Sequence, residues 1–100
     1  MHTTTCKLVT IIVDRLLADE IASEILERGA GGYTVTDAHG RGSRGLDPLD
    51  WEGSNVRIET LVPPETADRI IEHLAEKYFS HPGVIAFLHD VEVVRARKFS

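Results

Sequence analysis

The chain has 100 residues, of which 42% are hydrophobic, and its formal net charge at pH 7 is −5. This length supports a single domain, residues 1–100, with one modest core, and excludes a second core. The acidic balance excludes a general nucleic-acid binder, because such a protein needs a dominant basic surface.

The first third of the chain predicts a strand, a helix and a second strand. Residues 7–13 are rich in valine and isoleucine, which favour a central strand. Apolar residues then recur at helical spacing from Leu17 onward, with Asp14 as the expected N-cap and Gly29 as the expected end of the helix. Residues 31–38 alternate apolar side chains with threonines, which predicts the second strand.

A long irregular loop is expected between His39 and Ser54. Neither a helical nor a strand period holds over these 16 residues, and five glycine or proline residues exclude a helix. Loops of this length in compact domains are usually functional. We therefore expect the loop to contact a ligand or a partner.

The second half of the chain predicts a strand, a helix and a strand. Residues 55–62 alternate like a half-buried strand, an apolar stripe from Ala67 to Phe79 predicts a helix, and residues 84–94 predict the last strand. The order βαββαβ predicts an α+β, ferredoxin-like fold, with a four-stranded antiparallel sheet and both helices on one face. The other face must be solvated or pack against another copy, and the valine- and isoleucine-rich alternation of the first and fourth strands favours burial in an oligomer.

The loop begins with a candidate anion site, Gly40-Arg41-Gly42-Ser43-Arg44, followed by Gly45. Glycines free the backbone so that consecutive N–H groups can surround a phosphate, and the two arginines add positive charge. The pattern matches G-x-G-x-x-G, but Pro48 and Gly53 prevent the helix that a dinucleotide-binding fingerprint requires. A solvated glycine-arginine loop is the alternative.

Two further arginines, Arg95 and Arg97, follow or end the last predicted strand and point to the same side by the two-residue period of a strand. Their guanidinium groups repel each other unless an anion or carboxylates lie between them. They are therefore candidates for a second part of the anion site. A solvated C-terminus is the alternative.

Other chemistries find little support in the sequence. The five histidines are scattered without metal-ligand spacing, so a metal site within one chain is not expected. Ser43 has no evident base, so a catalytic triad is not expected. Cys6 is expected to be a small buried residue of a strand, and as the single cysteine it cannot form an intrachain disulfide.

The chain is expected to work in the cytoplasm. Its first five residues lack the basic and apolar regions of a signal peptide. No segment approaches the roughly 18 apolar residues that a membrane span needs.

Residues 32–42, Gly-Tyr-Thr-Val-Thr-Asp-Ala-His-Gly-Arg-Gly, resemble the strand and the T-loop entry of PII signalling proteins. The PII-like branch that is associated with bicarbonate transport and carboxysomes is more similar still. The similarity to this branch lies in residues 29–35, residues 40–44 and residues 76–79. The resemblance covers nearly the whole chain. It identifies the loop at about residues 39–54 as a T-loop.

The resemblance implies a homotrimer whose sheets face a central axis, with an adenine nucleotide in each of the three clefts between subunits. By position, the adenine pocket would be lined by Ile12, Thr34 and Val35. The phosphates would be contacted by Gly40, Arg41, Gly42, Ser43 and Arg44. Arg95 and Arg97 would close the site. The nucleotide would then order or release the T-loop, which would engage a partner such as a bicarbonate transporter or a carboxysome-related protein.

Two departures from the PII pattern bear on the ligand. Arg44 stands where PII proteins have the glutamine used with magnesium and 2-oxoglutarate, which argues against 2-oxoglutarate sensing. The lysine-bearing B-loop is reduced to residues 81–83, which removes a usual contact to the terminal phosphates. We therefore expect ADP, AMP or cyclic AMP rather than ATP, and a bicarbonate ion near the arginines is a hypothesis.

A non-enzymatic regulatory protein without a cofactor is the leading interpretation, and two alternatives stay open. The first is a metal-handling trimer of the divalent-cation-tolerance type, which would use histidines and Cys6 across subunits. The second is a small hydrolase of phosphate esters or acylphosphates, for which the sequence suggests no general base.

Overall fold

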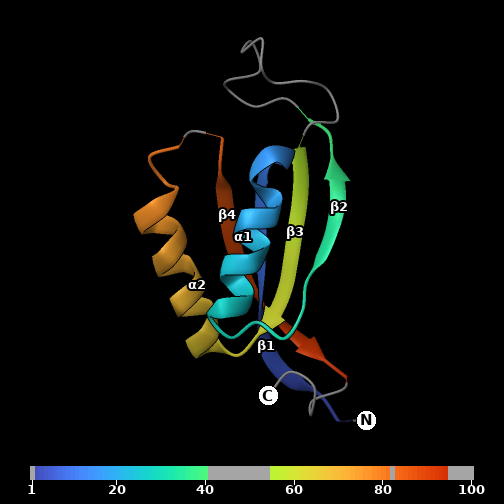
Figure 1. Ribbon diagram of the computed structural model, residues 1–100. Helices are drawn as coiled ribbons and strands as arrows, with labels where there is room; N and C mark the ends of the chain where they lie inside the picture. Colours follow the sequence, from blue (N-terminus) through green and yellow to red (C-terminus); the bar gives the residue numbers. More distant parts are fainter. Residues whose placement is uncertain (1, 41–54, 82, 95–100) are drawn as a thin grey trace.

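The computed structural model describes residues 2–40, 55–81 and 83–94 of the chain. Its elements follow the predicted order βαββαβ (Figure 1). They are β1 (Thr4–Asp14), α1 (Arg15–Glu27), β2 (Thr34–Ala38), β3 (Asn55–Val62), α2 (Pro64–Lys77) and β4 (Ile85–Val93). The second strand is three residues shorter than the predicted range 31–38, because regular pairing begins only at Thr34.

The strands form one antiparallel sheet in the order β2-β3-β1-β4. Both helices lie on the same face of this sheet (Figure 1), so the predicted ferredoxin-like architecture is confirmed. The register pairs Ile11 with Ile58 and Val13 with Val56. These side chains are buried with Ile21, Ile70 and others of the two helices, and together they form the core.

Helix α1 begins and ends with the local signals that the sequence predicts. The Asp14 carboxylate accepts a hydrogen bond from the Leu16 backbone N–H at 2.8 Å, which caps the N-terminus. At the C-terminus, the N–H groups of Gly29 and Ala30 donate to the carbonyl oxygens of Leu26 and Ile25, both at 3.1 Å. This is a Schellman motif, and Gly29 adopts the left-handed φ of 110° that it requires.

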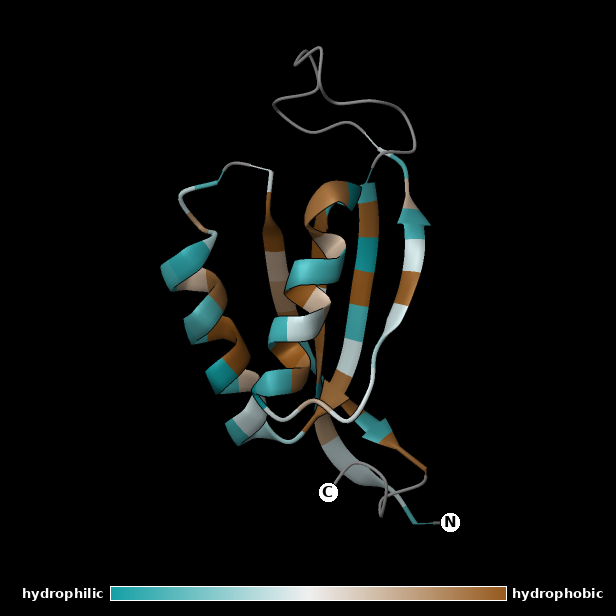
Figure 2. Ribbon diagram, viewed as in Figure 1, coloured by the Kyte–Doolittle hydropathy of each residue, from teal (hydrophilic) through white to brown (hydrophobic). Residues whose placement is uncertain are grey.

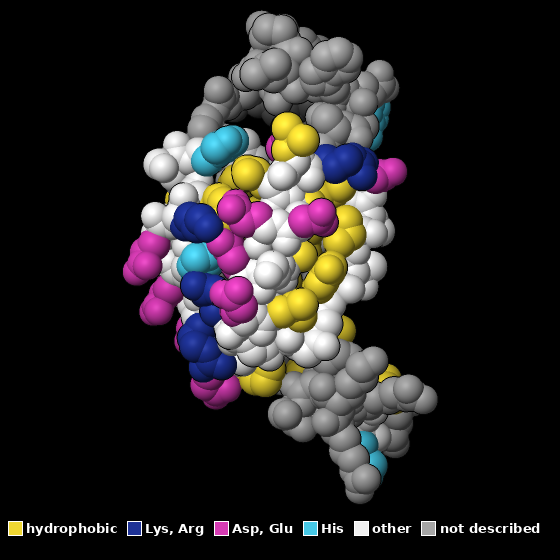
Figure 3. Space-filling model, viewed as in Figure 1, with side chains coloured by type: hydrophobic (Ala, Val, Ile, Leu, Met, Phe, Trp, Pro, Cys, Tyr) yellow, Lys and Arg dark blue, Asp and Glu magenta, His cyan; other side chains and the backbone are white. Residues whose placement is uncertain are grey.

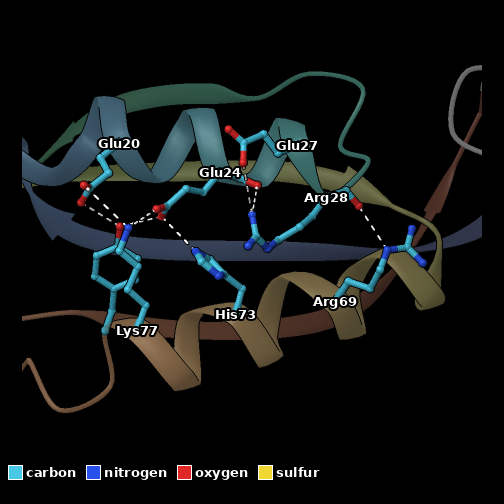
Figure 4. A network of polar contacts seen from close by, with 8 residues as sticks. Glu20, Glu24, Glu27, Arg28, Arg69, His73 and Lys77 are labelled. Atoms are coloured by element: carbon cyan, nitrogen blue, oxygen red, sulfur yellow. Dashed lines mark hydrogen bonds and ion pairs between the residues drawn. The ribbon is translucent and has the colours of Figure 1, made fainter.

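A polar network joins α1 to α2 around Glu24, whose side chain is 13% exposed. Its carboxylate contacts Lys77 Nζ, accepts a hydrogen bond from the Tyr78 hydroxyl at 2.6 Å and lies 3.1 Å from His73 Nε2 (Figure 4). Burial alone would raise the pKa of Glu24, but hydrogen bonds from Lys77, Tyr78 and His73 lower it to about 2. Burial, together with the hydrogen bond to Glu24, raises the pKa of Tyr78.

The two faces of the domain differ in surface chemistry. On the helix side, acidic and basic side chains are interspersed, most densely around α2 (Figure 3). On the sheet face that α1 and α2 leave uncovered, β4 carries Ile85 and Phe87, which are 55% and 41% exposed. Leu8 and Ile12 lie beside them on β1 and are half-buried. An exposed apolar sheet face of this kind is typical of a subunit interface.

Alternating hydropathy along β3 explains why one side is core and the other is surface (Figure 2). Val56, Ile58 and Val62 are buried, whereas Arg57 is exposed and Glu59 is half-buried.

Cys6 is buried in β1, as predicted. Neither described helix is long and apolar enough to cross a membrane.

Candidate functional site

A cavity of about 810 Å³ opens at the end of the sheet where β2 begins and β4 ends. It extends over the face that the helices leave uncovered, because Leu8, Thr34 and Leu61 point to that face in the observed register. The cavity is lined by Leu8, Gly29, Gly31, Gly32, Tyr33, Thr34, Glu59, Thr60, Leu61, Val62, Pro63, Thr66, Val91, Glu92 and Val93.

One wall of the cavity is the connection between α1 and β2, residues 29–33, which we call the glycine wall. Its glycines at positions 31 and 32 leave the backbone exposed to the cavity. The Thr60 hydroxyl donates a hydrogen bond of 2.6 Å to the Gly32 carbonyl oxygen and ties the glycine wall to β3. Bare backbone of this kind lets a flat ligand approach closely and offers it both donors and acceptors.

The chemistry of the lining favours a neutral, partly apolar ligand that carries hydrogen-bond donors. Leu8, Leu61 and Val91 provide an apolar floor, and hydroxyl groups come from Tyr33 and Thr34. Two carboxylates, from residues 59 and 92, can accept hydrogen bonds from amino or hydroxyl groups. The described lining contains no lysine or arginine, so this cavity suits a heterocyclic base and a sugar better than a phosphate.

The predicted site residues fall into two regions of the described chain. Thr34 lines the cavity. Ile12 pairs with Arg57 and Ile85 near the opposite end of the sheet, and Gly40 lies two residues after the end of β2 on that side. A single copy of the chain therefore does not bring Ile12 and Gly40 together with Thr34.

Val35 pairs with Ile58, whose side chain is in the core, so Val35 points to the helix side of the sheet. It is 43% exposed there and does not line the cavity. Six other predicted contacts lie outside the described residues: Arg41, Gly42, Ser43, Arg44, Arg95 and Arg97. Their roles remain predictions.

Several lining residues were not predicted, among them Glu59, Leu61 and Glu92. The alternation along residues 55–62 indicated that Glu59 and Leu61 share a face, but it could not indicate which strands flank them. The register supplies this information, because Thr34 pairs with Glu59 and Leu8 pairs with Leu61. Arg57, which pairs with both Ile12 and Thr36, was also not predicted and is an exposed cation at the loop end of the sheet.

The fold and the cavity define a ferredoxin-like domain with a candidate ligand site that extends over its uncovered sheet face. The family model described as nitrogen regulatory protein P-II matches residues 6–98. The chain therefore belongs to the P-II family, as its sequence resemblance indicated.

Solved structures agree with this assignment. A PII-like signalling protein from Thermus thermophilus is 47% identical over 100% of both chains, with a TM-score of 0.85. CPII from Thiomonas intermedia, a PII-like protein bound to ADP, AMP and bicarbonate, is 27% identical over 98% of this chain and 96% of its own, with a TM-score of 0.80. The apo form of CPII is 23% identical over 92% and 95%, with a TM-score of 0.72, and shares the fold.

Proposed function

We propose that this PII-like protein is a non-enzymatic regulator that binds an adenine nucleotide. The observation that carries the proposal is the chemistry of the cavity, whose apolar floor, hydroxyl groups and carboxylates suit a base and a ribose. The 27% identical CPII, bound to ADP, AMP and bicarbonate, supports an adenine nucleotide as the ligand. The T-loop at about residues 39–54 and the single domain over residues 1–100 are part of the same proposal.

The complete site forms between two copies of the chain. Residue Gly40, where the T-loop begins, lies at the end of β2 away from the cavity. A neighbouring copy can bring its loop end, with Ile12 and Arg57, to the cavity of the first copy. The exposed apolar side chains on the uncovered sheet face support such an assembly, and we propose the homotrimer that the PII resemblance implies.

The phosphates of the nucleotide contact basic residues outside the described part of the chain. The candidates are Arg41 and Arg44 of the T-loop and Arg95 and Arg97 near the C-terminus, because the cavity itself offers carboxylates to a phosphate. ADP, AMP or cyclic AMP is favoured over ATP. Bicarbonate is proposed as a second ligand near the arginines, by analogy with CPII.

Nucleotide binding would order or release the T-loop, which would engage a partner in the acquisition of inorganic carbon. A bicarbonate transporter and a carboxysome-related protein are the proposed kinds of partner, and this part rests on the sequence resemblance. A cytoplasmic location also remains a prediction.

The metal-handling alternative gains no support from the structure. Among residues 2–40, 55–81 and 83–94, no three histidine, cysteine, aspartate or glutamate side chains cluster as metal ligands would.

Calorimetric titration with AMP, ADP, ATP and cyclic AMP, with and without bicarbonate, tests the proposal. We expect binding by at least one of ADP, AMP and cyclic AMP, and about tenfold weaker binding after Glu59→Ala or Arg44→Ala. Glu72→Ala, which removes an exposed carboxylate of α2, is the matched control and should leave the affinity unchanged. The proposal fails if none of the four nucleotides binds, or if Glu59→Ala and Arg44→Ala bind as tightly as the wild type.

A further inference from the structure

Arg69 of α2 connects the end of α1 to the start of α2 directly behind the glycine wall. Its Nε donates a hydrogen bond to the carbonyl oxygen of Arg28 at 3.3 Å (Figure 4). Its Nη2 donates to the Thr66 hydroxyl at 3.0 Å. Arg28 is the C-cap of α1, and its carbonyl group is among those that a helix leaves without an intrahelical partner. Arg69 thus caps α1 from the neighbouring helix.

The same guanidinium group lies against two residues that line the cavity. Gly29 and Thr66 both contribute to the lining, and Thr66 is buried. A Cβ added to Gly29 would lie 3.3 Å from Arg69 Nη2 and 3.5 Å from Thr66 Cγ2. The glycine wall is therefore packed on its outer side by a residue that does not itself line the cavity.

The glycine wall is held at both of its ends. Thr60 fixes the Gly32 carbonyl near β2, and Arg69 fixes the Arg28 carbonyl where the wall leaves α1. The planar guanidinium group can donate in two directions at once, whereas a lysine ammonium at the end of a flexible stem has no fixed fork. The arrangement therefore depends on arginine and not only on positive charge.

We propose that Arg69 is a positioning residue for the ligand cavity, which sets the position of the glycine wall through the Arg28 carbonyl and Thr66. This inference rests on the proposed function, because the ligand that the wall would contact is the adenine nucleotide. A loosened wall costs affinity, because the ligand must then order it on binding.

Lys77 offers a matched control, because it also joins α1 and α2 but does so from the C-terminal end of α2. Its Nζ contacts Glu24 and lies 3.7 Å from Glu20, and in Figure 4 these contacts are at the opposite end of the network from Arg69. Lys77→Ala therefore removes an ionic contact between α1 and α2 and leaves the surroundings of the cavity intact.

The experiment compares Arg69→Ala, Arg69→Lys and Lys77→Ala with the wild type. ADP affinity is measured by calorimetry well below the melting temperature of each variant, and amide hydrogen exchange is followed over residues 29–33 without ligand. We expect Arg69→Ala to weaken ADP binding about tenfold and to speed exchange in the glycine wall, with partial recovery in Arg69→Lys. Lys77→Ala should lower the melting temperature and change neither property more than about twofold.

Two results would overturn the inference. One is an Arg69→Ala protein with wild-type exchange over residues 29–33. The other is a loss of affinity in Arg69→Ala and Lys77→Ala that simply follows their loss of melting temperature, because Arg69 would then be only a general stabilising residue. If the wild type binds no nucleotide, the proposed function fails separately, and the exchange measurement still decides whether Arg69 positions the wall.

Discussion

The hydroxyl group of Thr60 lies 2.6 Å from the carbonyl oxygen of Gly32, so a buried side chain of β3 fixes the position of the cavity wall. Thr60→Val keeps the shape of the side chain and removes the hydrogen-bond donor. We expect a loss of stability of about 1 kcal/mol and weaker nucleotide binding, because the glycine wall loses its hydrogen bond to β3. Urea denaturation and calorimetry measure the two effects.

The control for Thr60 is Thr36→Val, which changes an exposed threonine of β2 that does not line the cavity. It should alter the free energy of unfolding by less than about 0.5 kcal/mol. Equal stability losses in both variants would contradict a specific role for the hydrogen bond between Thr60 and Gly32.

Gly29→Ala should destabilise the protein by about 1 to 2 kcal/mol, because an L side chain is strained at the observed φ of 110°. The added Cβ would also press on Arg69 at 3.3 Å. Gly31→Ala is the comparison, since a Cβ there would meet no atom of the described chain within 4 Å. Thermal denaturation of both variants checks the prediction, and a Gly29→Ala protein as stable as Gly31→Ala would refute it.

Glu24→Gln should cost about 2 kcal/mol near neutral pH, because Lys77 and Tyr78 would lose a charged acceptor. The exposed Glu27→Gln, whose carboxylate lies 3.7 Å from Arg28, should cost much less. The free energy of unfolding in urea measures both. Similar losses for the two variants would show that the buried network around Glu24 adds little.

The network also predicts an acid dependence of stability. Because the pKa of Glu24 falls from 4.5 to about 2 on folding, its contribution is fully present above about pH 4.5 and is lost as the pH falls toward 2. The wild type should therefore lose more stability than Glu24→Gln over this interval. Parallel curves of unfolding free energy against pH for the two proteins would contradict the assignment.

Phe87→Glu should dissociate the proposed trimer, because the new charge would be buried where subunits pack through the uncovered sheet face. Leu88→Glu is a close control: Leu88 is 39% exposed, against 41% for Phe87, but it points to the opposite face. Light scattering should give the mass of one chain for Phe87→Glu and an unchanged oligomer for Leu88→Glu. An unchanged mass in both would argue against this interface.

Much of the fold could be predicted because its signals are local. Asp14 and Gly29 mark the ends of α1 through hydrogen bonds and backbone conformation within a few residues. The two-residue period places Ile58 and Arg57 on opposite faces of β3 without reference to any other strand. Such signals need no knowledge of which elements lie side by side.

The site was harder to predict because it depends on register and on distant contacts. The resemblance implies that Thr34 and Val35 line one adenine pocket, and only the register shows that the two side chains point to opposite faces of β2. Nothing local to Arg69 indicates its contact with Arg28, which is 41 residues away. Glu24 and His73 likewise meet only when the helices pack, so the scattered histidines gave no sign of this contact.

The cavity draws its lining from all four strands and from the first turn of α2. A ligand held there touches parts of the chain that are first brought together by the complete sheet, so it has little to bind in a partly unfolded molecule. Occupancy should consequently be linked to global unfolding and not to the opening of one segment. The melting temperature of the whole domain would then report the fraction of sites that are occupied by ligand.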